Sequence, residues 1–336
     1  MTAVPAERAA SFVRTGGEPR FEATIPRELA HKRAVEEMFL TDIVVDPGGE
    51  RVVAGAQLPR SHALHNEVDN GLHDLLLMLE IARQAGTIYG HVRLAIPGET
   101  AFVMSELRVE VVDLGALRQG EGPAELVFEV PFGEERRDRR GRVRRYMLIG
   151  AGSIDGRPAM ELSGEALLIP EALYERMRTV EVGAGAGADG APAPDPVEPA
   201  SVGRRSPRNV VVGDAVRVGG ELRCALIADA AHPTFFDHPL DHVPGMLMLE
   251  AARQAALLHV GGLGWPPEQS VLDACVARFS RYAALSPPAS CRVGACEPFA
   301  AAPDAGPPAE HLRVAFSQAG AELGHADLRL RRIGAG

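Results

Sequence analysis

The chain has 336 residues, an apolar fraction of 46% and a formal net charge of −10 at pH 7. This length fits about two domains of about 150 residues each, and the apolar fraction suffices for a core in each of them. Because affinity for nucleic acid comes mainly from neutralised phosphates, the negative charge argues against nucleic acid as a partner. No run approaches the length of a membrane helix and the start of the chain lacks the layout of a signal peptide, so we expect a cytoplasmic protein without a membrane span.

All four cysteines lie in the second half of the chain: Cys224, Cys275, Cys291 and Cys296. Their spacing matches no zinc-binding pattern, and a domain with a large core does not need disulfides. We therefore expect reduced thiols that pack in the core. The sequence predicts neither a metal nor a cofactor.

The first half predicts a loose arm over residues 1–26, one strand, one long helix and four further strands. Residues 31–40 fit a short helix or the lead into a strand, and the alternation of residues 51–58 is typical of a strand. The long helix is expected to run from Asp74, a suitable N-cap, to about Gly90. Runs rich in Val, Phe and Leu, separated by Gly, Pro and charged turns, predict the later strands at residues 101–112, 124–131, 142–154 and 158–169.

The second half begins with a linker and then repeats this order of elements. Residues 182–200 are rich in Gly, Ala and Pro and have almost nothing to bury, which indicates a flexible linker. We therefore divide the chain into an arm over residues 1–26, a first copy over 27–180, a linker over 181–203 and a second copy over 204–336. The strands of the second copy are expected near residues 209–212, 221–228, 270–280, 290–298, 310–317 and 323–331.

Both halves carry the same apolar helix with the same polar residues inside it. A shift of 170 residues (250 − 80) places the run LMLE that ends at Glu80 on the run LMLE that ends at Glu250, and the pair RQ at 83–84 on RQ at 253–254. This period is too long for a solenoid and indicates a duplicated domain. A helix that is apolar nearly all round is buried, and one such helix with an antiparallel sheet makes each copy an α+β domain.

Glu250 and Arg253 lie three residues apart on one face of the second helix, where they can pair. A carboxylate inside an apolar helix costs several kcal/mol unless it is compensated, so its presence in both copies indicates a use. The alternative is a structural ion pair. For Glu80 and Arg83 a vestigial role also stays open, because the first copy lacks the Pro-Gly entrance of the second helix.

The loop and helix of the second copy resemble the active-site segment of β-hydroxyacyl-ACP dehydratases. This segment reads FFDHP at residues 235–239 and PGMLMLEA at residues 244–251. The resemblance implies a hot-dog fold, in which an antiparallel sheet wraps one long helix, and it implies catalytic roles for His238 and Glu250. The match is imperfect, because the gap between the two parts of the segment is shorter than in the dehydratases.

A second resemblance covers nearly the whole chain and is carried by three motifs in order. They are GAQLPRSH at residues 55–62, HDLLLMLEIARQAGTIYGH at 73–91 and DHPLDHVPGMLMLEAARQAA at 237–256. Together they resemble the A-factor biosynthesis family, tandem hot-dog proteins that begin the synthesis of γ-butyrolactone signals and whose relatives feed furan and butenolide signals. The family is understood to transfer a β-ketoacyl group from acyl carrier protein to dihydroxyacetone phosphate. The resemblance therefore implies a carrier-protein or CoA thioester and dihydroxyacetone phosphate as partners.

This chemistry gives each candidate residue of the second helix a role. We expect the backbone N–H groups of Gly245 and Met246 to form an oxyanion hole at the start of the helix. Burial is expected to raise the pKa of Glu250, which would suit that carboxylate to deprotonate the accepting hydroxyl. Arg253 would hold a phosphate or the enolised β-keto oxygen in its fork of donors.

Four further residues complete the predicted site. Glu80 is the catalytic counterpart of Glu250 in the first copy, and Arg83 is expected to bind substrate beside it. His238 is a second catalytic candidate, while His242 competes with it and is assigned to substrate binding. No Ser or Cys occupies a motif position, so we expect direct transfer without an acyl-enzyme.

Hot-dog domains usually pair, so the resemblance also implies that the two copies form an intrachain pseudo-dimer with one continuous sheet. If the active sites are exchanged between the copies, Glu250 faces the loop of the first copy, residues 62–73, while His238 faces Glu80. The histidine that opens each loop is expected to hold loop geometry. Whether the chain also forms a homodimer stays open.

Residues 134–145 (EERRDRRGRVRR) hold seven arginines in an otherwise acidic chain. One interpretation is a solvated hairpin between two strands. The other is a docking surface for an acidic carrier protein, because opposite charge favours association.

Two other classes of function stay open. A dehydratase or thioesterase would use the same fold, with water in place of the accepting alcohol in the thioesterase. A non-catalytic acyl-binding protein would keep the apolar pocket and would tolerate the change Glu250→Gln.

Overall fold

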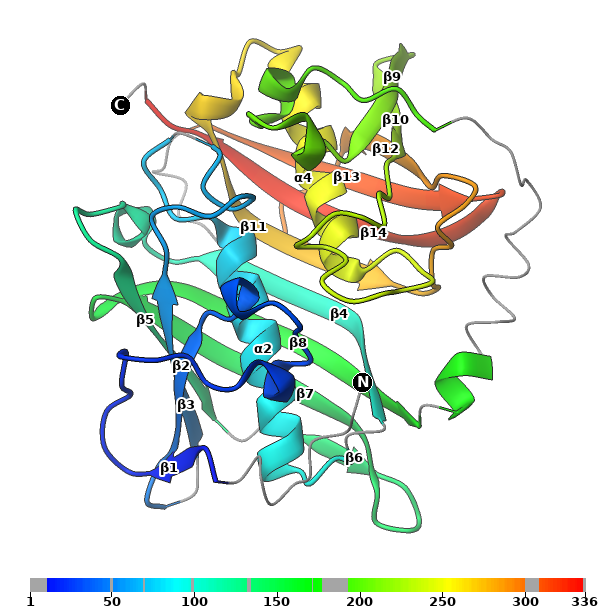
Figure 1. Cartoon of the computed structure of the whole chain (residues 1–336). Coiled ribbons are helices and arrows are strands. Elements are labelled where there is room, and N and C mark those ends of the chain that lie inside the picture. The colour runs from blue at the N-terminus through cyan, green and yellow to red at the C-terminus, as the bar shows by residue number, and fades with distance from the viewer. Residues whose placement is uncertain are drawn as a thin grey trace. The chain divides into compact units, whose positions relative to one another are not determined.

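The structure is a computed structural model of the chain, and it describes residues 11–48, 51–68, 70–97, 100–131, 134–170, 172–176, 193–299 and 308–334. The chain divides into two compact units, which Figure 1 colours from the blue N-terminus to the red C-terminus. Unit 1 comprises Met1–Ser61 and His73–Glu175, and unit 2 comprises His62–Leu72 and Arg176–Gly336. Of the predicted arm and linker, residues 1–10 and 181–192 lie outside the described residues.

Unit 1 is built on an antiparallel sheet with the strand order β2-β3-β5-β7-β8-β4. The short β1 joins the β2 edge in parallel, and β6 pairs with β7 beside this path. The strands are β1 (Val13–Thr15), β2 (Leu40–Val45), β3 (Arg51–Leu58), β4 (Thr100–Val111), β5 (Ala124–Pro131), β6 (Glu135–Arg137), β7 (Val143–Ile154) and β8 (Arg157–Pro170).

Unit 2 has an antiparallel sheet with the strand order β11-β14-β13-β12-β10-β9. Its strands are β9 (Val212–Val218), β10 (Glu221–Leu226), β11 (Ser270–Phe279), β12 (Ser290–Ala295), β13 (Ala309–Gln318) and β14 (Ala321–Arg332). Read from the opposite edge, this order matches that of unit 1 strand for strand, with β9 in the place of β2 and β11 in the place of β4. The prediction of two hot-dog domains in tandem is therefore confirmed.

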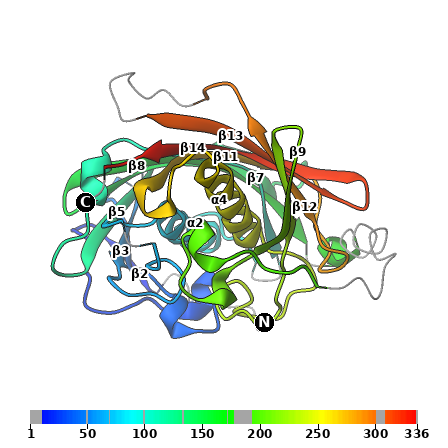
Figure 2. The ribbon, with the colours of Figure 1, turned by 90° about the horizontal axis from the view of Figure 1, so that it is seen from above.

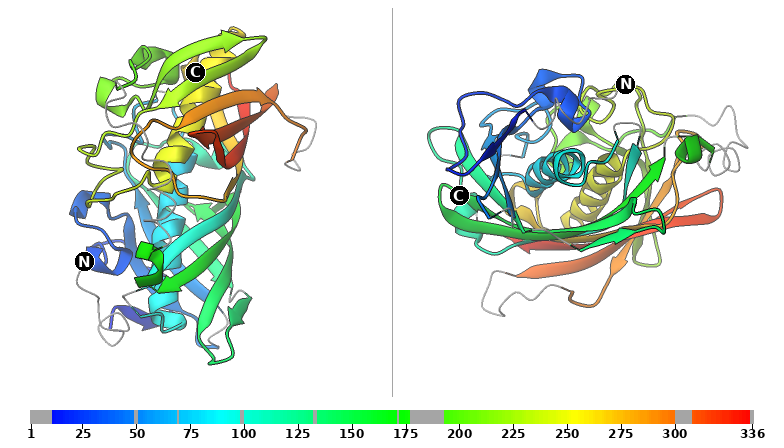
Figure 3. Two further views of the ribbon diagram at one scale, coloured as in Figure 1. Left: turned by 90° about the vertical axis from the view of Figure 1, so that its right-hand side faces the viewer. Right: turned by 90° about the horizontal axis from the view of Figure 1, so that it is seen from below.

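Each sheet wraps one long helix of its own unit, α2 (Leu75–Arg93) in unit 1 and α4 (Gly245–Gly261) in unit 2. Figures 2 and 3 show both helices lying against a face of their sheets. Arg83 is the one residue between Leu75 and His91 that is not buried, and in α4 every residue from 247 to 257 is buried. Since burying a large apolar side chain contributes about 2 kcal/mol, these helices account for much of each core.

In unit 1 the prediction of a single strand before the helix is wrong, because β2 precedes β3 and the short β1 lies further upstream, in the predicted arm. In unit 2 two strands were expected before the helix and two are present, the first over residues 212–218 rather than 209–212. In unit 1 the missed strand is β2, which is buried on both faces and so shows no alternation of polar and apolar residues. Asp42 is buried in the middle of β2, where it accepts hydrogen bonds from Arg14 Nε (2.9 Å) and Arg20 N (3.0 Å). Arg14 lies in β1, so this part of the predicted loose arm is ordered against the sheet.

Asp74 caps α2 as predicted, because its side chain accepts a hydrogen bond of 2.9 Å from Leu76 N. Cys224 and Cys291 lie opposite each other on β10 and β12, and both are free thiols, as are Cys275 and Cys296. None of the helices in the described ranges is long and apolar enough to cross a membrane.

Candidate functional site

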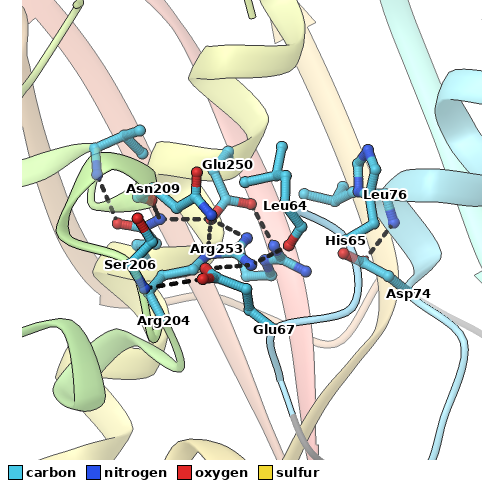
Figure 4. Close-up of polar contacts among 12 residues, drawn as sticks. Leu64, His65, Glu67, Asp74, Leu76, Arg204, Ser206, Asn209, Glu250 and Arg253 are labelled. Carbon is cyan, nitrogen blue, oxygen red and sulfur yellow. Dashed lines mark hydrogen bonds and ion pairs between the residues drawn. The ribbon is translucent and has the colours of Figure 1, made fainter. Parts of the chain in front are cut away.

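The carboxylate of Glu250 is the centre of a buried polar cluster in unit 2 (Figure 4). Its Oε1 accepts hydrogen bonds from Arg204 Nε (3.1 Å), Arg204 Nη2 (2.5 Å) and Gln254 Nε2 (2.5 Å). Its Oε2 accepts from Arg253. The predicted pairing of Glu250 with Arg253 is therefore present, and Arg204 adds a second guanidinium that the sequence pattern did not indicate.

Gln254 connects this cluster to the segment that leads into β9. Its Nε2 donates to the carbonyl of Asn209 (2.7 Å), and its Oε1 accepts from Val211 N (2.9 Å). The side chain thus continues the backbone hydrogen bonding of that segment, which explains why a buried helix carries a glutamine at this position.

The loop of the first copy, His62–Leu72, lies beside this cluster, within unit 2. Arg204 Nη1 donates to the carbonyl of Leu64 (2.6 Å), and Asn209 Nδ2 donates to the carbonyl of Ala63 (2.6 Å). Glu67 Oε1 accepts from Ser206 N (2.8 Å). The cluster therefore combines residues of the second copy with a loop of the first, as the exchanged arrangement predicts for Glu250.

Unit 1 contains a matching cluster around Glu80. Arg83 binds this carboxylate with two donors, Nε to Oε2 (2.7 Å) and Nη2 to Oε1 (2.8 Å). Gln84 Nε2 donates to Oε1 (3.0 Å), and Lys32 Nζ lies 3.0 Å from the same oxygen. Gln84 also donates to the carbonyl of Glu37 (2.8 Å), in the way that Gln254 contacts Asn209.

Lys32 and Arg204 are corresponding residues, and each follows the same kind of turn. A short 3-10 helix, η1 (Arg27–Ala30) or η4 (Pro199–Val202), ends at a residue in the left-handed conformation, His31 (φ 58°) or Gly203 (φ 67°). The next residue supplies the cation. The separation of Lys32 and Arg204 is 172 residues (204 − 32), which differs from the 170 of the helices and hides the correspondence.

The Glu80 carboxylate is held in the charged form. Burial acts to raise the pKa of the Glu80 carboxyl, but the positive charges of Arg83 and Lys32, with the hydrogen bonds from Arg83 and Gln84, lower it well below its ordinary value. For Glu80 the neighbouring cations therefore outweigh burial. Glu250 has two guanidinium partners, Arg204 and Arg253, and the raised pKa expected for it stays a prediction.

The arginines of the two clusters differ in their access to solvent. The Arg83 side chain is 29% exposed, whereas the Arg253 side chain is 7% exposed. The second cation is nearly enclosed in unit 1, where Lys32 is 8% exposed, and fully enclosed in unit 2, where Arg204 is 0% exposed. Arg83 therefore has the more accessible guanidinium for a ligand.

The start of α4 offers backbone donors, as predicted. Its N-cap, Pro244, provides no side-chain cap, and its carbonyl accepts from Leu247 N (3.0 Å) and Met248 N (3.2 Å). The N–H groups of Gly245 and Met246 precede these, and a Cβ added at the exposed Gly245 would meet nothing within 4 Å. This end of the helix carries positive potential, so it suits a developing oxyanion.

The loop before α4 holds the predicted histidines in different settings. His238 Nδ1 lies 3.7 Å from Asp237 Oδ2, and the His238 side chain is 32% exposed. His242 Nδ1 lies 3.0 Å from Asp241 Oδ1, and its ring meets the Tyr282 ring edge-on at 5.5 Å. His238 is therefore the more accessible of the two.

The histidines that open the two loops hold loop geometry. His62 Nδ1 accepts from Leu64 N (3.2 Å) and His65 N (3.3 Å). In the same way His232 Nδ1 accepts from Thr234 N (3.2 Å) and Phe235 N (3.3 Å). Among the described residues there is no group of three His, Cys, Asp or Glu that could hold a metal ion.

Two copies of one helix-and-sheet domain, each with a buried Glu–Arg–Gln cluster, define a tandem hot-dog protein. The oleoyl thioesterase (putative) of Lactobacillus plantarum shares this fold, with a TM-score of 0.51, 11% identity and coverage of 84% of this chain and 97% of that one. The family model of the A-factor biosynthesis hotdog domain matches residues 14–164 and 186–334. The chain therefore belongs to the A-factor biosynthesis family.

Curated relatives are similar over most of the chain. The 2-oxo-3-(phosphooxy)propyl 3-oxoalkanoate synthase of Streptomyces virginiae is 37% identical over 272 residues, which is 79% of this chain and 85% of that protein. The synthase of the same name from Streptomyces griseus is 34% identical over 278 residues, 80% of this chain and 84% of that protein.

Proposed function

We propose that this protein is an acyltransferase that moves a β-ketoacyl group from a thioester to the hydroxyl of dihydroxyacetone phosphate, the first step of γ-butyrolactone-type signal synthesis. The observation that carries the proposal is the similarity to two synthases whose product name describes this ester. A 2-oxo-3-(phosphooxy)propyl group is dihydroxyacetone phosphate without its free hydroxyl, whose oxygen becomes the ester oxygen. A 3-oxoalkanoate is the β-ketoacyl part.

The reaction exchanges one acyl bond for another. The hydroxyl oxygen of the acceptor attacks the thioester carbonyl carbon, a C–O bond forms, the C–S bond breaks, and the hydroxyl proton ends on the departing thiol. We assign the N–H groups of Gly245 and Met246 to stabilising the oxyanion, since donors of this kind lower a barrier by about 3–4 kcal/mol.

The charged clusters suit binding of the acceptor better than proton transfer. The lowered pKa of Glu80 makes that carboxylate a weak base, and both oxygens of Glu250 are already bound by arginines, so we assign Glu80 and Glu250 to orienting their arginines. Arg83 and Arg253 then hold the phosphate or the β-keto oxygen. His238, with Asp237 beside it, takes the proton of the hydroxyl.

We infer that the acyl donor is a carrier protein that docks on the hairpin of β6 and β7. Asp138 organises this hairpin, accepting from Arg142 Nε (2.9 Å) and Arg144 Nε (3.0 Å). Arg136, Arg139 and Arg140 are exposed, and their side chains take part in none of the described ion pairs. An acidic surface of the donor would find its counter-charges there.

We place the reaction in the cytoplasm, because that compartment keeps thiols such as the facing pair Cys224 and Cys291 free. The pairing of the copies as a pseudo-dimer and the meeting of His238 with Glu80 stay predictions, and so does the homodimer.

The test is a substrate trial with purified protein. β-Ketoacyl thioesters are incubated with dihydroxyacetone phosphate or, as a matched control, with dihydroxyacetone, and the products are identified by mass. The proposal expects the phosphorylated ester with the first acceptor and little ester with the second. Free β-keto acid as the product would indicate a thioesterase, and a thioester that is bound but unchanged would indicate an acyl-binding protein.

A further inference from the structure

Arg204 is the residue through which the loop His62–Leu72 reaches the Glu250 cluster. Its side chain is 0% exposed, and it donates from Nε and Nη2 to Glu250 and from Nη1 to the carbonyl of Leu64. Glu67 lies 3.9 Å from the same Nη1. We propose that Arg204 is a positioning residue of the acyl-transfer site, which orients Glu250, and through it Arg253, and fixes this loop beside α4; the catalytic part of this proposal rests on the proposed function.

An arginine at position 204 can make contacts that a lysine cannot. A guanidinium presents five donors in a planar fork, so it can bind a carboxylate on one side and a carbonyl on another. In unit 1 the corresponding Lys32 contacts the Glu80 carboxylate through its ammonium group, which is a single point charge. Arg204 thus performs the task of Lys32 and adds the contact with the loop.

The hydrogen bonds on the two oxygens of Glu250 connect Arg204 to Arg253. Arg204 and Gln254 together occupy Oε1 of Glu250, which leaves Oε2 for Arg253. A change at Arg204 lets the carboxylate turn and carries the Arg253 guanidinium with it. A displacement of about 1 Å in a group that positions substrate can cost about a hundredfold in rate.

Arg204 can position Glu250 and the loop without being required for the fold. The loop has three other ties to the second copy, Asn209 to the Ala63 carbonyl, Ser206 to Glu67 and Asn70 to the Ser270 carbonyl, so it does not depend on Arg204 alone. A lysine at position 204 keeps the positive charge opposite Glu250. What it cannot keep is the simultaneous contact with Glu250 and Leu64.

The test uses the chain's own counterpart as the control. Arg204→Lys copies the residue of unit 1 into unit 2, and Lys32→Arg makes the reverse change. We expect Arg204→Lys to unfold cooperatively near the wild-type temperature, to exchange the backbone amide hydrogens of residues 64–67 faster, and to lower kcat about tenfold or more. Lys32→Arg is expected to leave exchange in this loop unchanged.

Wild-type exchange in the loop together with wild-type kcat in Arg204→Lys would overturn the proposal. So would a loss of kcat that matches the unfolded fraction measured in the same sample. Hydrogen exchange needs no substrate, so the contact between Arg204 and the loop is tested even if the wild-type protein makes no ester. In that case the proposed function fails while faster exchange still supports the role of Arg204 in fixing the loop.

Discussion

At the scale of single residues, the main finding is that Glu80 and Glu250 are bound by cations on both oxygens. Each carboxylate has one arginine on its own helix turn and a second cation from the segment before the first strand of its copy. A buried ion pair of this kind is not explained by folding stability alone, because well-packed apolar residues of similar volume often stabilise a fold equally well. The presence of this ion pair in both copies therefore favours a role for the two clusters in ligand binding.

The first prediction concerns Glu250 and Arg253. Glu250→Ala and Arg253→Ala are each expected to reduce ester formation by about a hundredfold or more, since each change frees the partner side chain from its position. Breaking a buried pair also costs about 3–5 kcal/mol of stability. Turnover is therefore measured beside thermal unfolding, and Glu250→Gln serves as the variant of the same shape. A folded Glu250→Ala protein with unchanged turnover would remove Glu250 from the site.

The second prediction concerns pH and Glu80. Its folded-state pKa lies below the unfolded value of about 4.3, so its ion pairs contribute their full stability above that pH and lose it as the pH falls toward the folded-state pKa. The gap in unfolding temperature between wild type and Glu80→Gln should be constant at neutral pH and should shrink below about pH 4. The exposed Glu268→Gln is the control, for which no such gap is expected. A gap that grows in acid would contradict the sign of the shift.

At the scale of elements, the long helices and most strands follow from the sequence, because each is a pattern within one stretch of chain. The strand predicted over residues 51–58 matches β3, and the cap at Asp74 is present. Two features of the element pattern escaped prediction. β2 is buried on both faces and therefore shows no alternation, and Lys32 and Arg204 lie in turns whose residues are otherwise unlike.

The third prediction belongs to the hairpin of β6 and β7. Changing Arg136, Arg139 and Arg140 together to Ser is expected to raise KM for a carrier-bound donor about tenfold, since three exposed ion pairs of about 0.5 kcal/mol each are lost. KM for a small thioester analogue should not change. Arg142 and Arg144 are left in place, because Asp138 uses them to shape the hairpin.

The control for the hairpin variant removes the same charge elsewhere. Arg118, Arg176 and Arg281 are also exposed, and changing them to Ser alters the net charge by the same amount. If this control weakens the carrier-bound donor as much as the hairpin variant, the effect is one of net charge and the docking surface is refuted. High salt should narrow the gap between wild type and the hairpin variant.

At the scale of the whole molecule, the chain crosses between its two units. The strand order of the copies could be expected from the repeat, but the place of His62–Leu72 in unit 2 depends on contacts between residues far apart in the chain. Leu64 and Arg204 are separated by 140 residues, and no local pattern reports such a contact. The helix residues of the cluster followed from the repeat, and the approach of the loop to Glu250 followed from the resemblance, whereas the turns that supply Lys32 and Arg204 were not expected.

The fourth prediction follows from this crossing. Residues 181–336 produced alone lack the loop that satisfies Arg204, Ser206 and Asn209, so they are expected to unfold at a lower temperature than the same residues combined with residues 1–180. A peptide of residues 60–73 should recover part of the difference, and a scrambled peptide should not. An isolated second copy as stable as the full chain would contradict the account of the loop.

The contacts that hold the loop also determine how freely its sequence can drift during evolution. Two of the four ties end on backbone carbonyls of the loop, those of Ala63 and Leu64, which every amino acid provides. Glu67 and Asn70 contribute side chains to the other two. Substitutions at the exposed position 63 can therefore accumulate without loosening the loop, whereas Leu64, whose side chain is buried, and Arg204 and Asn209, which supply side chains, are constrained. A lineage can vary the exposed side chain at position 63 while the frame that holds the loop stays the same.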